Sequence, residues 1–157
     1  MEDIYNIERF KQAQDCGVFE RALEEVQSGQ KTGHWIWFIF PQLRGFGRSY
    51  NSHFYGITCA AEARAYLADP VLGGRLRAIT QAFLGTSLSP FEVFGRVDTL
   101  KLCSCMTLFD FVSPNDLFGQ VLEAKFEGER DLDSLELLQH PHHQPDESRK
   151  SLFNPNN

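Results

Sequence analysis

Apolar residues recur at the three- and four-residue spacing of an α-helix along most of this chain. The pattern predicts helices over residues 4–13, 15–28, 58–67, 70–85, 98–111, 117–126 and 132–139. A shorter helix over residues 89–94 leads to Gly95. We therefore predict an all-α fold, a single compact domain of about seven helices over residues 1–139.

The stretch 31–42 departs from this pattern, because residues 35–40 are all apolar. Such a run fits either a buried strand or a short buried helix, and the proline that follows ends it in both cases. On a strand, Trp35 and Trp37 would share one face and could stack on a planar ring; packing in the core is the alternative. Residues 49–55 follow as a short helix or a turn.

A chain of 157 residues, 42% of them apolar, is sufficient for one domain with one core. The C-terminal residues 140–157 contain few apolar side chains, so we expect a disordered tail there. The histidines of this tail, His140, His142 and His143, have no framework of cysteine or carboxylate ligands around them. We therefore expect no metal site.

The net charge of −6 argues against nucleic acid as a main partner. No apolar run approaches the ~20 residues that span a bilayer, and the N-terminal sequence lacks a signal core, so we expect a cytoplasmic protein with no membrane partner. In a reducing compartment, the four cysteines should be free thiols. The Walker, Rossmann, G-x-S-x-G and H-E-x-x-H motifs are absent, and no cofactor is indicated. These absences remove common enzyme classes without excluding an enzyme.

A polar stripe of Asp98, Lys101 and either Ser104 or Cys105 lies on a helix that is apolar on two other sides. A buried lysine needs a partner, and Asp98 lies one turn away from Lys101. The stripe is therefore either the wall of a pocket or one exposed strip of an ordinary helix. As a pocket wall, it gives Asp98 an acid–base role, while Lys101 tunes the pKa of Asp98 or forms a transient covalent adduct.

Further candidates lie in or just after the central stretch. His34 is suited to acid–base catalysis or to binding a phosphate or ribose, although a ring satisfied by nearby backbone groups is the commoner use of histidine. Lys31 and Arg48 are candidates for holding phosphate. The run Gly45-Phe-Gly-Arg-Ser49 resembles half of a phosphate loop, and a plain turn is the alternative.

Several longer motifs resemble a known family. They are Lys31-x-Gly-His-Trp-x-Trp-Phe-Ile-Phe-Pro-Gln42, Gly45-x-Gly-x-Ser49, Glu62-Ala-x-Ala-Tyr-Leu67 and Phe94-Gly-x-x-Asp-x-x-Lys-Leu-x-Ser104. Together they resemble the domain-of-unknown-function family 1810 over about residues 7–139. The resemblance implies a mainly helical fold and no established activity. It also implies a set of characteristic polar positions, which are Lys31, His34, Gln42, Ser49, Tyr55, Asp98, Lys101 and Ser104.

The order of features is also similar to that of the NADAR family, helical enzymes that act on ADP-ribose linked through an N-glycosidic bond. The likeness lies in an aromatic and serine-rich entry, a Glu-Ala helix and a later helix that carries a lysine. As an analogy, it suggests a hydrolase that acts on an ADP-ribose-type substrate.

We therefore expect a pocket that binds or processes a nucleotide-like small molecule related to ADP-ribose or NAD. The expected catalytic residues are His34, Asp98 and Lys101. The expected ligand-binding residues are Lys31, Trp35, Trp37, Gln42, Arg48, Ser49, Tyr55 and Ser104. The alternative is a non-catalytic helical module for protein interaction, in which the polar residues form an internal network that fixes the fold. The sequence leaves the oligomeric state open.

Overall fold

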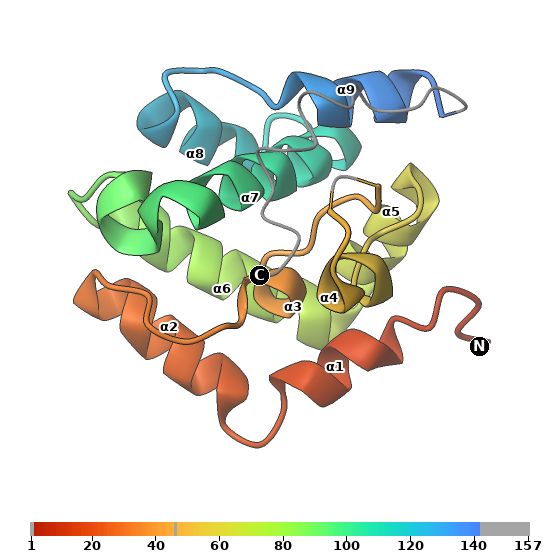
Figure 1. The fold of residues 1–157 in the computed structure, drawn as a ribbon, viewed down its shortest axis with the longest axis horizontal. Helices are drawn as coiled ribbons and strands as arrows, with labels where there is room; N and C mark the ends of the chain where they lie inside the picture. Colours follow the sequence, from red (N-terminus) through yellow and green to blue (C-terminus); the bar gives the residue numbers. More distant parts are fainter. Residues whose placement is uncertain (1, 46, 142–157) are drawn as a thin grey trace.

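Two long helices, α6 (Pro70–Gly85) and α7 (Pro90–Val112), cross the middle of the fold (Figure 1). The computed structural model describes residues 2–45 and 47–141. The other helices of these residues are α1 (Glu8–Gln14), α2 (Val18–Ser28), α3 (Ile36–Ile39), α4 (Tyr50–Phe54), α5 (Ala60–Ala68), α8 (Leu117–Lys125) and α9 (Leu132–Gln139). The described part contains no strand, and its one isolated β-bridge joins Leu43 to Ile57. The all-α prediction is confirmed.

Local capping explains where the two central helices begin. The Asp69 carboxylate accepts hydrogen bonds from the backbone N–H groups of Val71 and Leu72 at the start of α6. At the start of α7, the Ser89 hydroxyl and the Glu92 carboxylate each accept the other residue's backbone N–H, which forms a capping box. A proline follows each cap, where its missing N–H removes no helical hydrogen bond. Both starts are therefore set by neighbouring residues in the sequence.

A kink at Gly95 divides α7 into two segments. The backbone there has φ 79° and ψ 176°, a left-handed conformation that favours glycine. The predicted helices 89–94 and 98–111 correspond to these two segments. As a result, Asp98 lies near the start of the second segment, close to the kink.

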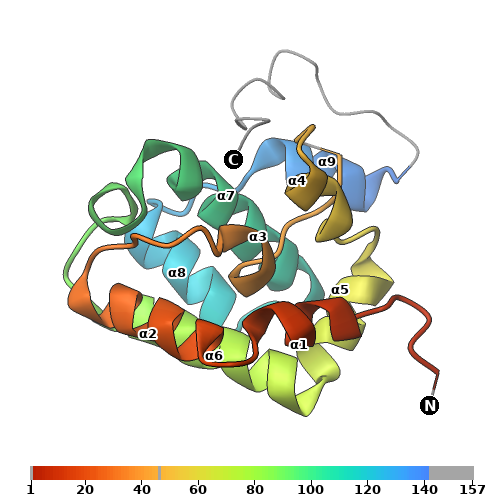
Figure 2. The ribbon, with the colours of Figure 1, turned by 60° about the horizontal axis from the view of Figure 1, so that its bottom comes forward.

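The helices form layers around α6 and α7 (Figure 2). Helices α1 and α2 pack against α6, whereas α8 and α9 pack against α7. The short helix α3 lies between α1 and α7 and has apolar neighbours on both sides. This helix is largely buried, which explains why its sequence is apolar at every position. For the run 35–40, the helix alternative is confirmed and the strand alternative is wrong.

The aromatic residues of the central stretch belong mainly to the core. The ring of Phe94 makes edge-on contacts with Trp35, Phe40 and Phe83, at centroid distances of 6.2, 5.7 and 5.2 Å. Such edge-to-face contacts add to the hydrophobic stabilisation that burial of the rings provides. Trp35 is therefore a core residue that ties the start of α3 to α7.

Three helices begin later than predicted. α1 starts at Glu8 instead of residue 4, and the Asp3 carboxylate accepts the N–H groups of Ile7 and Glu8 there. α2 starts after Gly17, because the Asp15 carboxylate binds Arg75 instead of capping the helix. α5 starts at Ala60, because the Glu62 carboxylate reaches back to the N–H and hydroxyl of Thr58. The predicted disordered tail, with His142 and His143, falls almost entirely outside the described residues, and the domain boundary at 139 remains a prediction.

Candidate functional site

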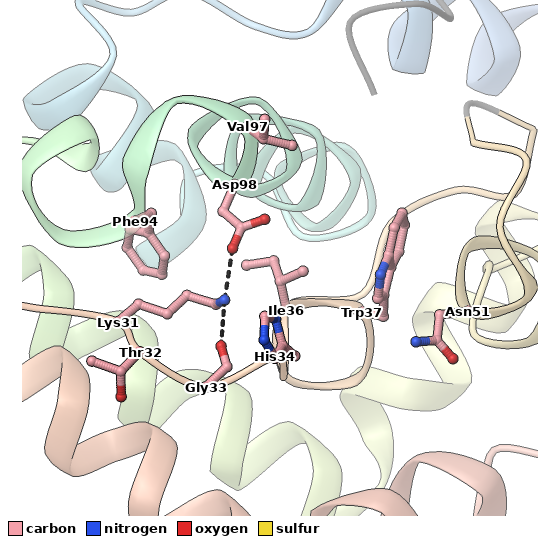
Figure 3. A pocket seen from close by; sticks show the side chains of 10 residues that line it. All are labelled: Lys31, Thr32, Gly33, His34, Ile36, Trp37, Asn51, Phe94, Val97 and Asp98. Atoms are coloured by element: carbon pink, nitrogen blue, oxygen red, sulfur yellow. Dashed lines mark hydrogen bonds and ion pairs between the residues drawn. The ribbon is translucent and has the colours of Figure 1, made fainter. Parts of the chain in front are cut away.

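An open cavity of about 270 Å³ lies beside the motif that contains both tryptophans. Its walls are the loop that precedes α3, the start of α3, Asn51 of α4 and the part of α7 around the Gly95 kink (Figure 3). The charged groups in this wall are the Lys31 ammonium and the Asp98 carboxylate. The site therefore combines a loop from the N-terminal half of the chain with the kinked helix from the C-terminal half.

Glu25, in the last turn of α2, holds the loop in place. One oxygen of its carboxylate, Oε1, accepts hydrogen bonds from Thr32 N, Gly33 N and Trp35 Nε1 at 2.7, 2.9 and 2.9 Å. Burial opposes ionisation of this carboxyl group, but the hydrogen bonds outweigh that effect and lower the pKa of Glu25. A Cβ atom at Gly33 would lie 2.8 Å from the Trp35 ring, so only glycine fits there.

Lys31 connects the loop to α7. Its Nζ lies 2.7 Å from Asp98 Oδ2 and donates a hydrogen bond of 2.6 Å to the Gly33 carbonyl oxygen (Figure 3). The ammonium group also lies 5.0 Å from the centre of a Trp35 ring, within the range of a cation–π contact. The Lys31 backbone N–H donates to the Val93 carbonyl oxygen at 2.8 Å. Lys31 is therefore held on both its main chain and its side chain.

Lys101 lies behind this pair and is fully buried. Its Nζ is 3.3 Å from Asp98 Oδ1 and 4.3 Å from the centre of a Trp37 ring. The approach to Asp98 lacks hydrogen-bond geometry, so the ammonium group has no hydrogen-bond partner. Burial lowers the pKa of Lys101, the Asp98 carboxylate opposes this change, and the charge of Lys31 adds to it. One carboxylate thus faces two lysine side chains, and the three side chains carry an excess positive charge when both lysines are protonated.

The predicted site residues divide into two groups. Lys31, His34, Trp37 and Asp98 line the cavity, and Lys101 lies directly behind Trp37 and Asp98. His34 is exposed at the rim. The structure therefore brings together the three residues expected to be catalytic, although Lys101 does not reach the cavity surface.

The remaining predicted residues do not line this cavity. The Ser104 hydroxyl, on the opposite side of the stripe, donates to the Leu100 carbonyl and to the Asp131 carboxylate that caps α9. Ser49 caps α4, and the ring of Tyr55 packs against Phe10 and Phe38. Gln42 is buried beside the bridge to Ile57, and Arg48 is exposed. Trp35 lies in the core under Lys31.

Ser104 shows why helical spacing misled the prediction. Residues at i, i+3 and i+6 drift around a straight helix, so Ser104 faces away from Asp98 and toward α9. In the run from Gly45 to Ser49, Phe46 lies outside the described residues, and Ser49 caps α4, a helix of five residues. The described residues of this run do not line the cavity, and the phosphate loop stays a prediction.

Some residues of the cavity and its support were missed by the sequence reasoning. The cavity is also lined by Thr32, Ile36, Asn51, Phe94 and Val97. Glu25, which holds the cavity loop, is the clearest omission. Its position offered one signal, because an acidic residue in the last turn of a helix opposes the helix dipole and needs another reason to be there.

Comparison with known proteins identifies the family. The family model described as "Protein of unknown function (DUF1810)" matches residues 4–138. The chain belongs to the DUF1810 family. It is also similar to the crystal structure of the conserved hypothetical protein Rv1873 from Mycobacterium tuberculosis, with 41% identity and a TM-score of 0.84. That match covers 87% of this chain and 99% of the other. No curated protein matches the chain.

The described residues set further limits on the chemistry. Within residues 2–45 and 47–141, no three histidine, cysteine or acidic side chains are grouped so that they could hold a metal ion. None of the helices in these ranges combines the length and the hydropathy needed to cross a membrane. All four cysteines are free, as predicted. Burial raises the pKa of the Cys103 thiol to about 11 and that of Cys105 as well, so neither is an activated nucleophile.

Proposed function

We propose that this DUF1810 protein binds a small phosphorylated, nucleotide-like ligand in the cavity beside Lys31 and Asp98. The observation that carries the proposal is the shared carboxylate, since two ammonium groups compete for Asp98 and leave a positive charge at an open cavity. The protein as a whole carries a charge of −6, so this local excess would favour an anion at this place.

The size of the cavity limits which part of a ligand it holds. A volume of about 270 Å³ is just below the range of roughly 300–1,000 Å³ that is common for small-molecule sites. We expect the ribose and phosphate of a ligand such as ADP-ribose to occupy the cavity, with the rest of the molecule outside. The tryptophans do not supply a free stacking platform, because lysines already occupy faces of Trp35 and Trp37.

The charged groups also favour one type of reaction. Cleavage of an N-glycosidic bond develops positive charge on the sugar. Once a ligand phosphate neutralises Lys31, the Asp98 carboxylate would stabilise that charge. His34, at the rim, would exchange a proton with the leaving group or with water. These roles make hydrolysis of an ADP-ribose-type substrate the reaction that we propose.

An interaction module is supported less well. A polar network that serves only to fix a fold should have its buried donors paired, because an unpaired buried group is unfavourable. The ammonium group of Lys101 is fully buried and has no hydrogen-bond partner. That state is easier to explain in a site that a ligand completes.

A thermal-shift experiment tests the proposal. The protein is melted with inorganic phosphate, ribose 5-phosphate, NAD or ADP-ribose, and then the same series is repeated with Lys31→Met and Asp98→Asn. A ligand at ~100 times its dissociation constant should stabilise the wild-type protein by about 2.7 kcal/mol. The shift should disappear in Lys31→Met, whereas Asp98→Asn removes the carboxylate that competes with phosphate for Lys31 and should keep the shift.

The matched control is Lys11→Met, since Lys11 pairs with Asp69 away from the cavity. This variant should keep the full shift. Circular dichroism checks that each variant is folded. A ligand-induced shift that survives in Lys31→Met would place binding elsewhere and would contradict the proposal.

A further inference from the structure

Anion binding does not require a lysine that is buried as deeply as Lys101. A lysine that only attracts phosphate works at the cavity surface, where Lys31 already lies. Burying a second ammonium group without a hydrogen bond is unfavourable, and its single ion-pair partner is shared. We therefore expect that the neutral amine form of Lys101, and not its ammonium form, has a role in the chemistry of the site.

Lys101 differs in this respect from the other lysines of the described chain. Lys11 pairs with Asp69 at the surface, and Lys31 is held by a carboxylate and a carbonyl group. Lys125 donates to the carbonyl oxygens of Thr86 and Leu88. Each of these three ammonium groups has partners that hold its protons, whereas the Lys101 nitrogen has only an ion pair at 3.3 Å.

A neutral amine of this kind is a nucleophile for carbonyl carbon. We propose that Lys101 forms an imine with the aldehyde group of a phosphorylated sugar bound in the cavity. This inference rests on the proposed function, because it uses the same cavity and the same anion-binding charge. It adds a substrate class, sugars whose ring opens to an aldehyde, and a covalent intermediate.

The step balances without an oxidant or a reductant. Lys101 first loses a proton, with Asp98 as the nearest acceptor. The Nζ lone pair attacks the carbonyl carbon, the C=O π pair moves to oxygen, and a proton passes from the nitrogen to that oxygen. The hydroxyl group of the resulting carbinolamine takes the proton that Asp98 holds and leaves as water while the nitrogen lone pair forms the C=N bond of a protonated imine. One amine and one aldehyde thus become one imine and one water molecule, and addition of water reverses the step.

Asp98 and Trp37 separate the Lys101 nitrogen from the cavity. Asp98 is the more accessible barrier, since its side chain is about 15% exposed and Trp37 is buried. A ligand phosphate that binds Lys31 would remove one of the two partners that hold this carboxylate. The bound ligand itself would therefore help to open the path to Lys101.

Reductive trapping tests the inference on the intact protein. The protein is incubated with ribose 5-phosphate and sodium cyanoborohydride, which converts an imine into a stable secondary amine. We expect one adduct per chain, with the mass of the sugar less one oxygen atom, and peptide mapping should place it on Lys101. The adduct should be lost in Lys101→Met and retained in Lys11→Met. Because mapping on the wild-type protein already locates the adduct, the result does not depend on whether a variant folds.

Ribitol 5-phosphate, which has no carbonyl group, separates this inference from the proposed function. If calorimetry shows that it binds but ribose 5-phosphate leaves no adduct on Lys101, then the imine is wrong and the anion pocket stands. If neither compound binds and no adduct forms, both proposals are wrong. If unphosphorylated ribose labels Lys101 as well as its phosphate does, then the imine stands and the phosphate site is wrong. Adducts spread over several lysines would also contradict the proposal of a specific imine on Lys101.

Discussion

Two buried charged groups of this protein are built in opposite ways. In the first, the Arg9 cluster, the guanidinium of Arg9 makes five hydrogen bonds, four to backbone carbonyl oxygens and one to the Glu62 carboxylate. Glu62 in turn accepts the N–H and hydroxyl of Thr58. In the second, the Lys101 cluster of Lys31, Asp98 and Lys101, one buried ammonium group has no hydrogen bond.

The two clusters differ in whether their hydrogen-bond donors are all used. Every donor of Arg9 is used, so the Arg9 cluster ties α1 to the segment from Phe54 to Glu62 and has no capacity left for a ligand. It adjoins a cavity of about 390 Å³, larger than the one at the Lys101 cluster. Of these two cavities, we therefore place the proposed ligand in the smaller one, where a buried donor has no hydrogen-bond partner.

Arg9→Met should give the largest effect. The substitution leaves the buried Glu62 carboxylate without its cation and several carbonyl oxygens without a donor, so we expect the free energy of unfolding to fall by about 4 kcal/mol. Urea denaturation measures this loss. The exposed Arg21→Met is the control and should change stability by less than about 0.5 kcal/mol. If both variants lose the same free energy of unfolding, then the Arg9 cluster does not have the structural role that we assign to it.

Glu25→Gln should have an intermediate effect. It weakens three hydrogen bonds that hold the cavity loop, so we expect a loss of about 1–2 kcal/mol together with weaker ligand binding. Glu24→Gln, at the exposed neighbouring position, should leave both properties unchanged.

The same carboxyl group predicts a pH dependence. Because folding lowers the pKa of Glu25 below its ordinary value of 4.5, the folded state binds fewer protons than the unfolded state near that pH. The stabilisation is complete above pH 4.5 and is lost as the pH falls through the folded pKa. Wild-type protein and Glu25→Gln should therefore converge in stability in acid, and a constant difference between them would argue against an ionised Glu25.

Lys101→Met should leave stability unchanged or slightly increased. The substitution removes a buried charge, while Asp98 keeps Lys31 at 2.7 Å. Lys125→Met provides the comparison, because Lys125 donates to two carbonyl oxygens and its loss should lower stability by about 1–2 kcal/mol. Thermal melts distinguish the two variants. A Lys101→Met protein that melts earlier than Lys125→Met would assign Lys101 a structural role.

Thiol labelling should reveal the smallest difference. Cys59, next to Thr58 of the Arg9 cluster, is exposed and should react with a disulfide reagent at once. Cys105, one turn beyond Lys101, is buried, and burial raises the pKa of its thiol, so it should react only when α7 opens. Mass spectrometry gives the two rates. Rapid labelling of Cys105 in the native protein would show that the surroundings of Lys101 are open.

Much of the fold followed from the sequence because helix ends are set locally. Asp69 and Ser89 act on N–H groups two or three residues away, and the kink at Gly95 needs only a glycine. The pairing of Lys101 with Asp98 was also predictable, since it joins residues three apart on one helix. Local spacing did not predict that Ser104 turns to Asp131, because that contact depends on where α9 packs.

The sequence by itself determined the helical class, the main helix boundaries and the family, since each depends on residues that lie near one another in the chain. Only the tertiary structure decided that Glu25 holds the cavity loop, that Lys31 reaches Asp98, and that Lys101 lies buried behind both. The physical reason is distance along the chain. Lys31 and Asp98 come from different elements, so their charges meet only after α3 and α7 have packed together.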